Sequence, residues 1–271
     1  MKKSLLFGAI AIFSATSFFS CQREEAAAPA AQEQSEAISQ EVLSKIKHLG
    51  FGTTDVKRIS QGFLVEGDIV LTQATLDEVP DHKLLLVGKE EHYRTNNLVY
   101  TGGGVRTITV SASTSLNSCY SSAINAAITR YNNLGLLIRF QRVTSGGEIN
   151  FVSGSGNFLA SAGFPTSGGN PHNQITVNVS AIGSCPSSGY LTTILAHEMG
   201  HCIGFRHTDY ADRSYSCGGT YANEGASTVG AIHIPGTPTG PDPTSWMLAC
   251  IGSGVNRPFN ANDVTALNYL N

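Results

Sequence analysis

The sequence predicts an α+β fold, because segments with helical periodicity alternate with short runs that are typical of strands. Hydrophobic residues make up 41% of the 271 residues, which is sufficient for a folded core. The composition also changes near residue 94: no lysine follows Lys89, and most of the 29 glycines lie after that point. This change indicates a boundary between a charged leader and a Gly-rich domain.

The first 21 residues predict a bacterial export signal. Lys2 and Lys3 form a positive start, and the apolar run 5–19 that follows is shorter than the roughly 20 residues that span a bilayer. The run ends in FFSC, which resembles the box of bacterial lipoproteins, in which the Cys is lipidated. We therefore expect lipidation at Cys21, with ordinary signal cleavage or an uncleaved anchor as the alternatives.

Residues 22–37 predict a flexible tether, because they are poor in aromatics and rich in Ala, Glu and Gln. Glu24 and Glu25 stand close behind Cys21 and resemble signals that send some lipoproteins to the cell surface, although a solvated charge pair is an equal interpretation. We expect an exported protein, either an outer-membrane or cell-surface lipoprotein or one secreted after processing. Membrane contact is expected through the lipid alone.

The rest of the leader, residues 38–94, is expected to form a helix followed by strands. Residues 38–49 present one apolar helical face that ends at Gly50, a helix stop. Residues 62–71 alternate like a single strand, and residues 82–87 form another short apolar element.

The larger domain, residues 95–271, mixes strands and helices. A helix is predicted over residues 117–135, since its apolar residues follow helical spacing and a glycine ends it. A further helix is expected to start near Asn262. Strands are predicted over residues 105–112, 136–143, 148–152 and 174–180, with an edge strand over residues 157–162.

The charge balance argues against one class of partner. Lys and Arg number 17 against 20 Asp and Glu, which gives a net charge of −3 and a pI near 6.2. Without a basic excess to neutralise phosphates, nucleic-acid binding lacks its main driving force. We expect a monomer that does not bind nucleic acid.

The string TTILAHEMGHCIGFRHTD carries the chemistry. His197 and His201 are four residues apart, which puts both imidazoles on one helical face, and Glu198 is adjacent and can reach a metal-bound water. Gly204 comes where a helix can end with positive φ, so the chain can turn back and deliver His207 as a third ligand. Three neutral imidazoles leave the fourth position of a zinc ion open, which is typical of a catalytic site.

HExxHxxGxxH resembles the signature of the metzincin metallopeptidases at all five fixed positions, and Ser245-Trp246-Met247 resembles their Met-turn, which puts Met247 beneath the zinc. Within the clan the sequence is most similar to the bacterial HEIGH peptidases, and more distantly to the astacins. The resemblance implies a metzincin-type zinc peptidase domain: a twisted mixed sheet with a backing helix and an active-site helix, and an irregular lower subdomain with the Met-turn and a C-terminal helix. It also implies that the substrate lies extended along an antiparallel edge strand of the sheet, here the segment around residues 157–162.

The resemblance implies an endopeptidase that hydrolyses proteins or peptides, with one catalytic Zn2+ on His197, His201 and His207 and with Glu198 as general base. Two positions depart from the astacins: Thr208 follows the third His in place of Glu, and Ala249 stands where astacins carry a tyrosine near the zinc. A binding lipoprotein that keeps the fold without catalysis, and a zinc hydrolase of non-peptide amides, are the alternatives.

The leader also carries a candidate for latency. Val65-Glu66-Gly67-Asp68 resembles the FxGD motif of astacin prosegments, whose Asp occupies the open zinc position. The resemblance implies that residues 38–94 are a prosegment and that Asp68 keeps the enzyme latent. An ordinary Gly-Asp turn is the alternative. Activation would require a cut between the leader and Val105, for which the bond after Arg94 is a candidate because its surroundings look exposed.

Other reactive side chains have structural interpretations. Export favours disulfides, but the five cysteines beyond Cys21 leave the pairs open. Asp209 and Asp212 could bind Ca2+, although no EF-type spacing supports it. His172 and His233 lack ligand spacing and are expected in solvated loops. The five cysteines are Cys119, Cys185, Cys202, Cys217 and Cys250.

Overall fold

The computed structural model describes residues 37–270 apart from residues 50, 78–91, 225–230 and 239. All helices and strands below belong to one unit, Ile38–Asn271. The predicted export signal with Cys21, the tether up to residue 36 and the apolar element at residues 82–87 lie outside the described residues. None of the described helices has the length and apolarity that a membrane span requires.

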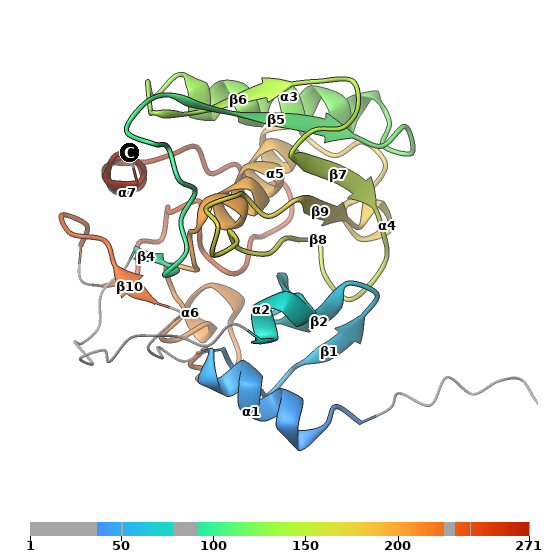
Figure 1. Cartoon of the computed structure of the whole chain (residues 1–271). Coiled ribbons are helices and arrows are strands. Elements are labelled where there is room, and N and C mark those ends of the chain that lie inside the picture. Colours follow the sequence, from blue (N-terminus) through green and yellow to red (C-terminus); the bar gives the residue numbers. More distant parts are fainter. Residues whose placement is uncertain (1–36, 50, 78–91, 225–230, 239, 271) are drawn as a thin grey trace, which may run out of the picture. The chain divides into compact units, whose positions relative to one another are not determined.

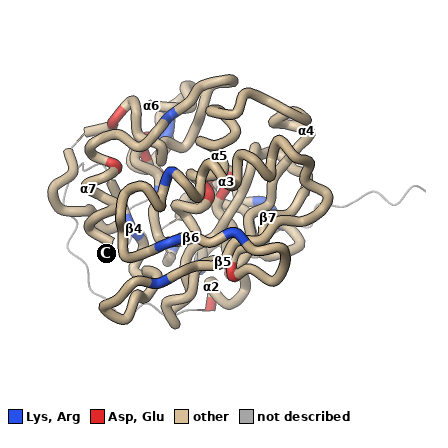
Figure 2. The backbone as a smooth tube through the Cα atoms, turned by 90° about the horizontal axis from the view of Figure 1, so that it is seen from above, with Lys and Arg blue, Asp and Glu red and all other residues tan. Residues whose placement is uncertain are grey.

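A five-stranded mixed sheet is the main β-structure (Figure 1), as the predicted α+β class requires. Its strands follow one another in the order β6 (Ile138–Arg142), β5 (Arg106–Ala112), β7 (Ile149–Ser153), β9 (Gln174–Val177) and β8 (Ala160–Ser161). The first four run parallel, and β8 pairs antiparallel with β9 at one edge. Figure 2 shows basic positions on β6, which forms the opposite edge.

The strand β9 ends before the predicted limit of residue 180. The Asn178 side chain accepts a hydrogen bond from the Ala181 backbone N–H at 3.2 Å and caps the short helix α4 (Val179–Ile182). The Asn178 amide also donates to the Gly156 carbonyl at 2.7 Å. The polar and apolar residues continue to alternate beyond the end of β9, but Asn178 caps a helix there, so the strand stops earlier than the alternation predicted.

Two longer helices pack against each other and against the sheet. The helix α3 (Ser118–Asn132) starts at Asn117, whose side chain accepts from two backbone N–H groups of the first turn. The helix α5 (Ser188–Ile203) is buried along almost its whole length. The Tyr131 hydroxyl of α3 donates to the Ala196 carbonyl of α5 at 2.8 Å, and one apolar core joins both helices to the sheet.

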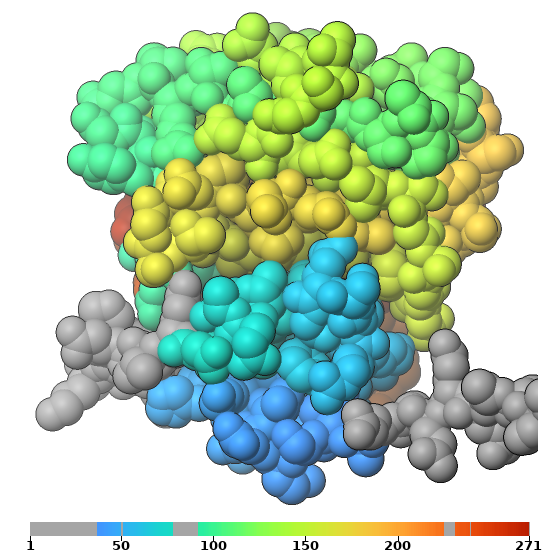
Figure 3. Space-filling model, turned by 45° about the vertical axis from the view of Figure 1, so that its right-hand side comes forward, coloured from blue at the N-terminus to red at the C-terminus, as the bar shows by residue number. Residues whose placement is uncertain are grey.

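The leader has its own small apolar core, which lies beside the edge of the sheet (Figure 3, blue to cyan against yellow). Its elements are α1 (Gln40–His48), β1 (Lys57–Ile59), β2 (Gly62–Val65), β3 (Ile69–Leu71) and α2 (Gln73–Asp77). The residues buried together are Ile46, Leu49, Phe51, Phe63, Val65, Ile69, Leu71 and Leu76.

The prediction of a single strand over residues 62–71 is wrong. The strands β2 and β3 pair antiparallel with Val65 opposite Ile69, so the chain reverses between them. Glu66 at φ +55° and Gly67 at φ +94° form the turn, and a glycine is favoured there because left-handed backbone strains other residues. Apolar alternation fits one long strand or two short ones equally well, so it could not reveal the reversal.

Beyond α5 the chain has few regular elements. The short strand β4 (Tyr93–Arg94) pairs antiparallel with β10 (Ile232–His233), and the remaining helices are α6 (Ser214–Cys217) and α7 (Ala261–Tyr269). Two disulfides stabilise the domain, one between Cys119 and Cys185 and the other between Cys217 and Cys250. Cys202 is buried as a free thiol.

The stretch around Arg94 is less exposed than the sequence indicated. Tyr93 and Thr95 are buried, and the Thr95 N–H donates to the Gly204 carbonyl at 2.9 Å. High exposure begins at Tyr100, 71% of which is accessible. The bond after Arg94 therefore lacks the high exposure that we expected at a cleavage site.

Candidate metal centre

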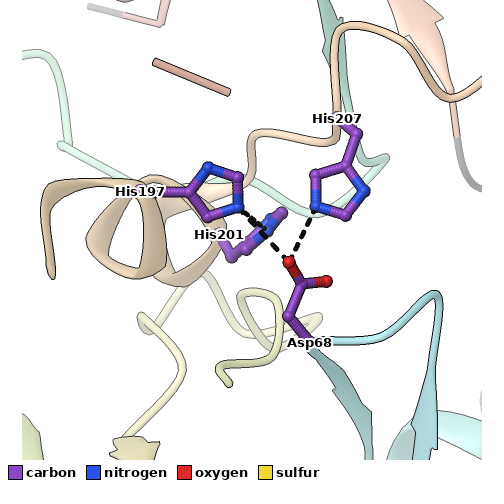
Figure 4. Close-up of side chains that lie close together, drawn as sticks. All are labelled: Asp68, His197, His201 and His207. Atoms are coloured by element: carbon purple, nitrogen blue, oxygen red, sulfur yellow. Dashed lines mark hydrogen bonds and ion pairs between the residues drawn. The ribbon is translucent and has the colours of Figure 1, made fainter. Parts of the chain in front are cut away.

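Two of the expected ligands lie on α5. His197 and His201 are one helical turn apart, so both rings leave the same face of the helix. The helix ends at Gly204, whose φ of +115° turns the chain, and His207 follows. Figure 4 shows the three imidazoles turned toward one point, with Asp68 of the leader facing them.

In the imidazoles of His197 and His201, the Nε2 lone pairs are available to bind a cation. His197 Nδ1 donates to the Trp246 carbonyl at 2.9 Å, and His201 Nδ1 donates to the Phe205 carbonyl at 2.8 Å. Both Nε2 atoms then carry lone pairs, yet they lie 3.0 Å apart, an arrangement that a metal ion stabilises. Burial lowers the pKa of His201 well below its usual value, which favours the neutral, ligating form.

Asp68 completes the group. Its Oδ2 atom lies 3.1 Å from His207 Nε2 and 3.5 Å from His197 Nε2. Although burial favours the neutral acid, the imidazoles hold the pKa of Asp68 well below its usual range. One ligand atom from each of the four side chains lies within 4.8 Å of the others, and three imidazoles with one carboxylate suit a tetrahedral zinc ion. These residues fit one zinc.

A carboxylate that the sequence did not single out holds the third imidazole. His207 Nδ1 donates to Glu224 at 3.1 Å, and Arg213 Nε forms an ion pair with Glu224 at 3.0 Å. Burial opposes protonation of His207, but Asp68 and Glu224 on its two sides raise its pKa above the usual value. Such outer carboxylates fix the tautomer and the direction of a metal-binding histidine. No spacing rule links residues 207 and 224, so no local pattern in the sequence indicates this contact.

Glu198 faces the cavity beside the histidines. Its side chain is buried, and its Oε2 atom has no hydrogen-bond partner among the described residues. Burial, reinforced by the charge of Asp68, raises the pKa of Glu198 well above its usual value. The cavity of about 230 Å³ is lined by Asp68, His197 and Glu198 together with Ile194 and Leu248. A carboxyl group with a raised pKa takes up a proton more readily than an ordinary glutamate does, as a general base requires.

The leader hydrogen-bonds to the chain directly after β8. The Val70 N–H donates to the Ala162 carbonyl at 2.6 Å, and the Ala162 N–H donates to the Asp68 carbonyl at 2.9 Å. The bridge between Ile69 and Ala162 is parallel. The leader thus runs in the opposite direction to a chain bound antiparallel at this edge.

A second contact between the leader and the enzyme domain was also not predicted from the sequence. Both carboxylate oxygens of Glu66 lie 2.6 Å from Arg206 Nη2, and the Arg206 guanidinium stacks 4.7 Å from the Phe51 ring centroid. Arg206 is completely buried by this contact and directly precedes the ligand His207. Burial raises the pKa of Glu66, an effect that the guanidinium opposes. The leader therefore contacts both the candidate ligand His207, through Asp68, and the residue before it, through Glu66.

Met247 lies beneath α5. A Cβ atom on Gly200 would come within 2.7 Å of the Met247 sulphur, so the helix and the turn pack too closely for a side chain there. The Thr208 N–H donates to the Met247 carbonyl at 2.9 Å, and the neighbouring Trp246 carbonyl holds His197. The Met-turn thus supports two of the three imidazole-bearing segments.

The remaining reactive residues have other surroundings. His172 is buried rather than solvated, with its pKa lowered to about 4 by burial, and His233 lies in β10 and bonds to Thr237. Asp209 accepts a hydrogen bond from the Ala249 N–H at 2.9 Å, and Asp212 accepts one from the Ser214 N–H at 3.1 Å. These contacts give both carboxylates structural roles.

Comparison with known proteins gives one family match. The model of a family described as dual-action HEIGH metallo-peptidase matches residues 63–271, a range that includes Asp68. Among solved structures, myroilysin is similar at 15% identity, covering 65% of this chain and 96% of that chain with a TM-score of 0.43. High choriolytic enzyme 1, a hatching-enzyme zinc protease from the medaka fish Oryzias latipes, is similar at 16% identity, covering 62% and 90% with a TM-score of 0.34. No curated protein matches.

Proposed function

The chain belongs to the dual-action HEIGH metallopeptidases and is a zinc-dependent endopeptidase that acts on proteins or peptides, and we propose that it is an exported, monomeric enzyme made as a latent zymogen with Glu198 as its general base. The observation that carries this proposal is the convergence of His197, His201 and His207 on Asp68, a leader residue, beside Glu198. His197, His201 and His207 are the proposed zinc ligands.

The proposed chemistry divides between the metal and Glu198. Zinc bound at the three imidazoles would polarise the scissile carbonyl and lower the pKa of a bound water to about 7. Glu198 lies on the same cavity wall with an unpartnered oxygen, so it is placed to take the proton of the attacking water and to pass it to the leaving amine. The raised pKa of Glu198 suits both transfers.

Glu198→Ala tests the catalytic role. We expect the activated variant to keep about one zinc per chain and to lose hydrolysis of casein by roughly 10²–10⁴-fold. An unchanged rate would exclude Glu198 as the base. If the unchanged enzyme itself does not hydrolyse casein, the result supports the alternative of a binding lipoprotein without catalysis. A parallel assay with cell-wall amides tests the other alternative, a zinc hydrolase of non-peptide amides.

Latency is proposed to rest on Asp68 and on the direction of the leader. Asp68 lies where a metal-bound water would have to stand, next to two imidazoles. The bridge of Ile69 with Ala162 is parallel, opposite in direction to a chain bound antiparallel at this edge, which supports the proposal that the leader is not presented for hydrolysis. The pair of Glu66 with Arg206 adds affinity at the same turn.

Asp68→Ala separates this proposal from the ordinary turn. Expressed as residues 22–271, the variant should be active before any cleavage, or should process itself faster than the unchanged sequence. Asp55→Ala is the matched control, because Asp55 is an exposed leader carboxylate paired only with Lys57 among the described residues. Equal latency of the Asp68 variant and the control would refute the role of Asp68.

Maturation and location are proposed from the ends of the leader. Residues 38–94 are proposed as the prosegment, with the activating cut between this leader and Val105. The bridge between Arg94 and Phe205, the hydrogen bond from the Arg206 N–H to the Tyr93 carbonyl and the pairing of β4 with β10 hold the end of the prosegment on the enzyme domain. The intact mass of the mature protein locates that cut.

Cys21 is the proposed lipidation site of an outer-membrane or surface lipoprotein, and a Cys21→Ala variant should lose labelling by a fatty-acid analogue. Labelling that persists would contradict this assignment.

A further inference from the structure

Arg213 lies on the wall of the catalytic cavity but has no part in the scheme above. It lines the cavity together with Asp68, His197 and Glu198. Its guanidinium faces Gly67, the residue before Asp68: a Cβ atom on Gly67 would lie 3.0 Å from Arg213 Nη2 and 3.7 Å from Nη1. The terminal nitrogens of Arg213 therefore lie beside the backbone that now occupies the cleft.

The position of Arg213 is held by the enzyme domain, not by the leader. Its Nε contacts Glu224 at 3.0 Å, and its backbone N–H donates to the Ala222 carbonyl at 2.8 Å. It directly precedes α6, which the disulfide from Cys217 joins to Cys250, another residue that lines the cavity. These contacts remain when the leader is removed, so the guanidinium is organised in advance.

Three other side chains of the cavity wall donate hydrogen bonds to backbone carbonyls. Trp246 Nε1 donates to the Ala196 carbonyl, Thr193 to the Gly189 carbonyl and Arg257 to the Cys250 carbonyl. Ala249 has no polar side chain. Arg213 Nη2 instead has the Cys217 sulphur at 3.9 Å, a weak acceptor, so its N–H groups are available to a ligand in the cleft.

We propose that Arg213 is a catalytic residue that donates hydrogen bonds to the carbonyl oxygen of the scissile peptide, more strongly as that oxygen gains negative charge. The inference rests on the proposed peptidase function. It gives the enzyme a charged donor in a cleft where Ala249, another lining residue, offers no polar side chain. A fixed cation in a buried site stabilises such developing charge without reorganisation.

The test uses Arg213→Gln and Arg213→Lys in the full chain, activated in trans by a trace of tagged unchanged enzyme that is then removed. Arg142→Gln on β6, at the far edge of the sheet, is the control. Neutral and acidic peptides are hydrolysed in parallel, zinc content is measured, and a phosphinic peptide, whose tetrahedral anion resembles the charged oxygen, is titrated by calorimetry.

We expect Arg213→Gln to retain zinc and to lower kcat roughly 100-fold on both peptides. Its binding of the phosphinate should weaken by a similar factor. Arg213→Lys should show smaller losses of kcat and of phosphinate affinity. Unchanged phosphinate affinity, loss of zinc together with activity, or an effect confined to the acidic peptide would each overturn the inference. If the unchanged enzyme hydrolyses neither peptide, the peptidase proposal fails, while the phosphinate titration still decides whether Arg213 binds a tetrahedral anion.

Discussion

The two parts of the enzyme domain, residues 106–203 and residues 204–270, differ in the charged side chains that they bury. In residues 106–203 the sheet, α3 and α5 share one apolar core, and the fully buried ionic or imidazole side chains described there are those of the site and His172. Residues 204–270 have few regular elements and bury many charges instead. These are Arg206, His207, Asp209, Glu224, Asp242 and Asp263.

The difference extends to the candidate ligands. His197 and His201 come from the apolar part, and backbone carbonyls orient them. His207 comes from the charged part, where Glu224 orients it and the leader residue Glu66 pairs with the adjacent Arg206. Removal of the leader therefore takes Asp68 away from His197 and His207 and takes Glu66 away from Arg206, but it leaves in place the backbone carbonyls that orient His197 and His201.

The largest expected effect is in the charged part. Asp263→Ala removes a completely buried carboxylate that pairs with His92 at 2.9 Å and accepts the Asn260 N–H at 2.9 Å. Because buried partners are left unpaired, we expect the free energy of unfolding to fall by about 3–5 kcal/mol. Chemical denaturation measures it.

The matched control is Asp55→Ala, which breaks an exposed ion pair with Lys57. We expect a loss of about 1 kcal/mol or less there. If both variants lose the same amount, burial of a paired carboxylate does not determine how much it contributes to the free energy of unfolding.

The same contrast explains what the sequence could predict. The helix at α3, the strands β5, β6 and β7, and the glycine end of α5 follow from hydrophobic period and cap chemistry, which are local. The three imidazoles were predicted because helix spacing and one glycine determine their approach. Glu224, Arg206 with Glu66, and Arg213 depend on contacts between distant segments that have no period, so no local pattern could reveal them.

His172 provides the pH test of the apolar part. Burial without a charged partner lowers its pKa to about 4, below the unfolded value of 6.5. The unfolded chain thus binds the proton first, so stability is full above pH 6.5 and falls as pH drops toward 4, by about 3 kcal/mol in all. Denaturation at pH 7 and pH 4.5 should show a smaller difference in His172→Gln than in the unchanged protein, and an equal difference would contradict the assignment.

The orientation of His207 by charge predicts a smaller effect on zinc. Glu224→Gln keeps the shape of the side chain but weakens its hold on Nδ1. We expect zinc affinity to fall about 10–100-fold, measured by competition with a chelating dye. Glu148→Gln, a partly exposed carboxylate paired with Arg106, should leave zinc affinity unchanged. An unchanged affinity in Glu224→Gln would show that the third ligand needs no charged support.

The smallest effect is expected in the centre of the sheet. Ile175 on β9 is completely buried in the apolar core, opposite Phe151 on β7. Ile175→Val removes one methylene and breaks no polar contact, so the free energy of unfolding should fall by about 1 kcal/mol. Zinc affinity and latency should not change, since both depend on charges that Ile175 does not touch. A loss as large as that of Asp263→Ala, or a change in zinc affinity, would mean that the apolar part supports the site as strongly as the charged part does.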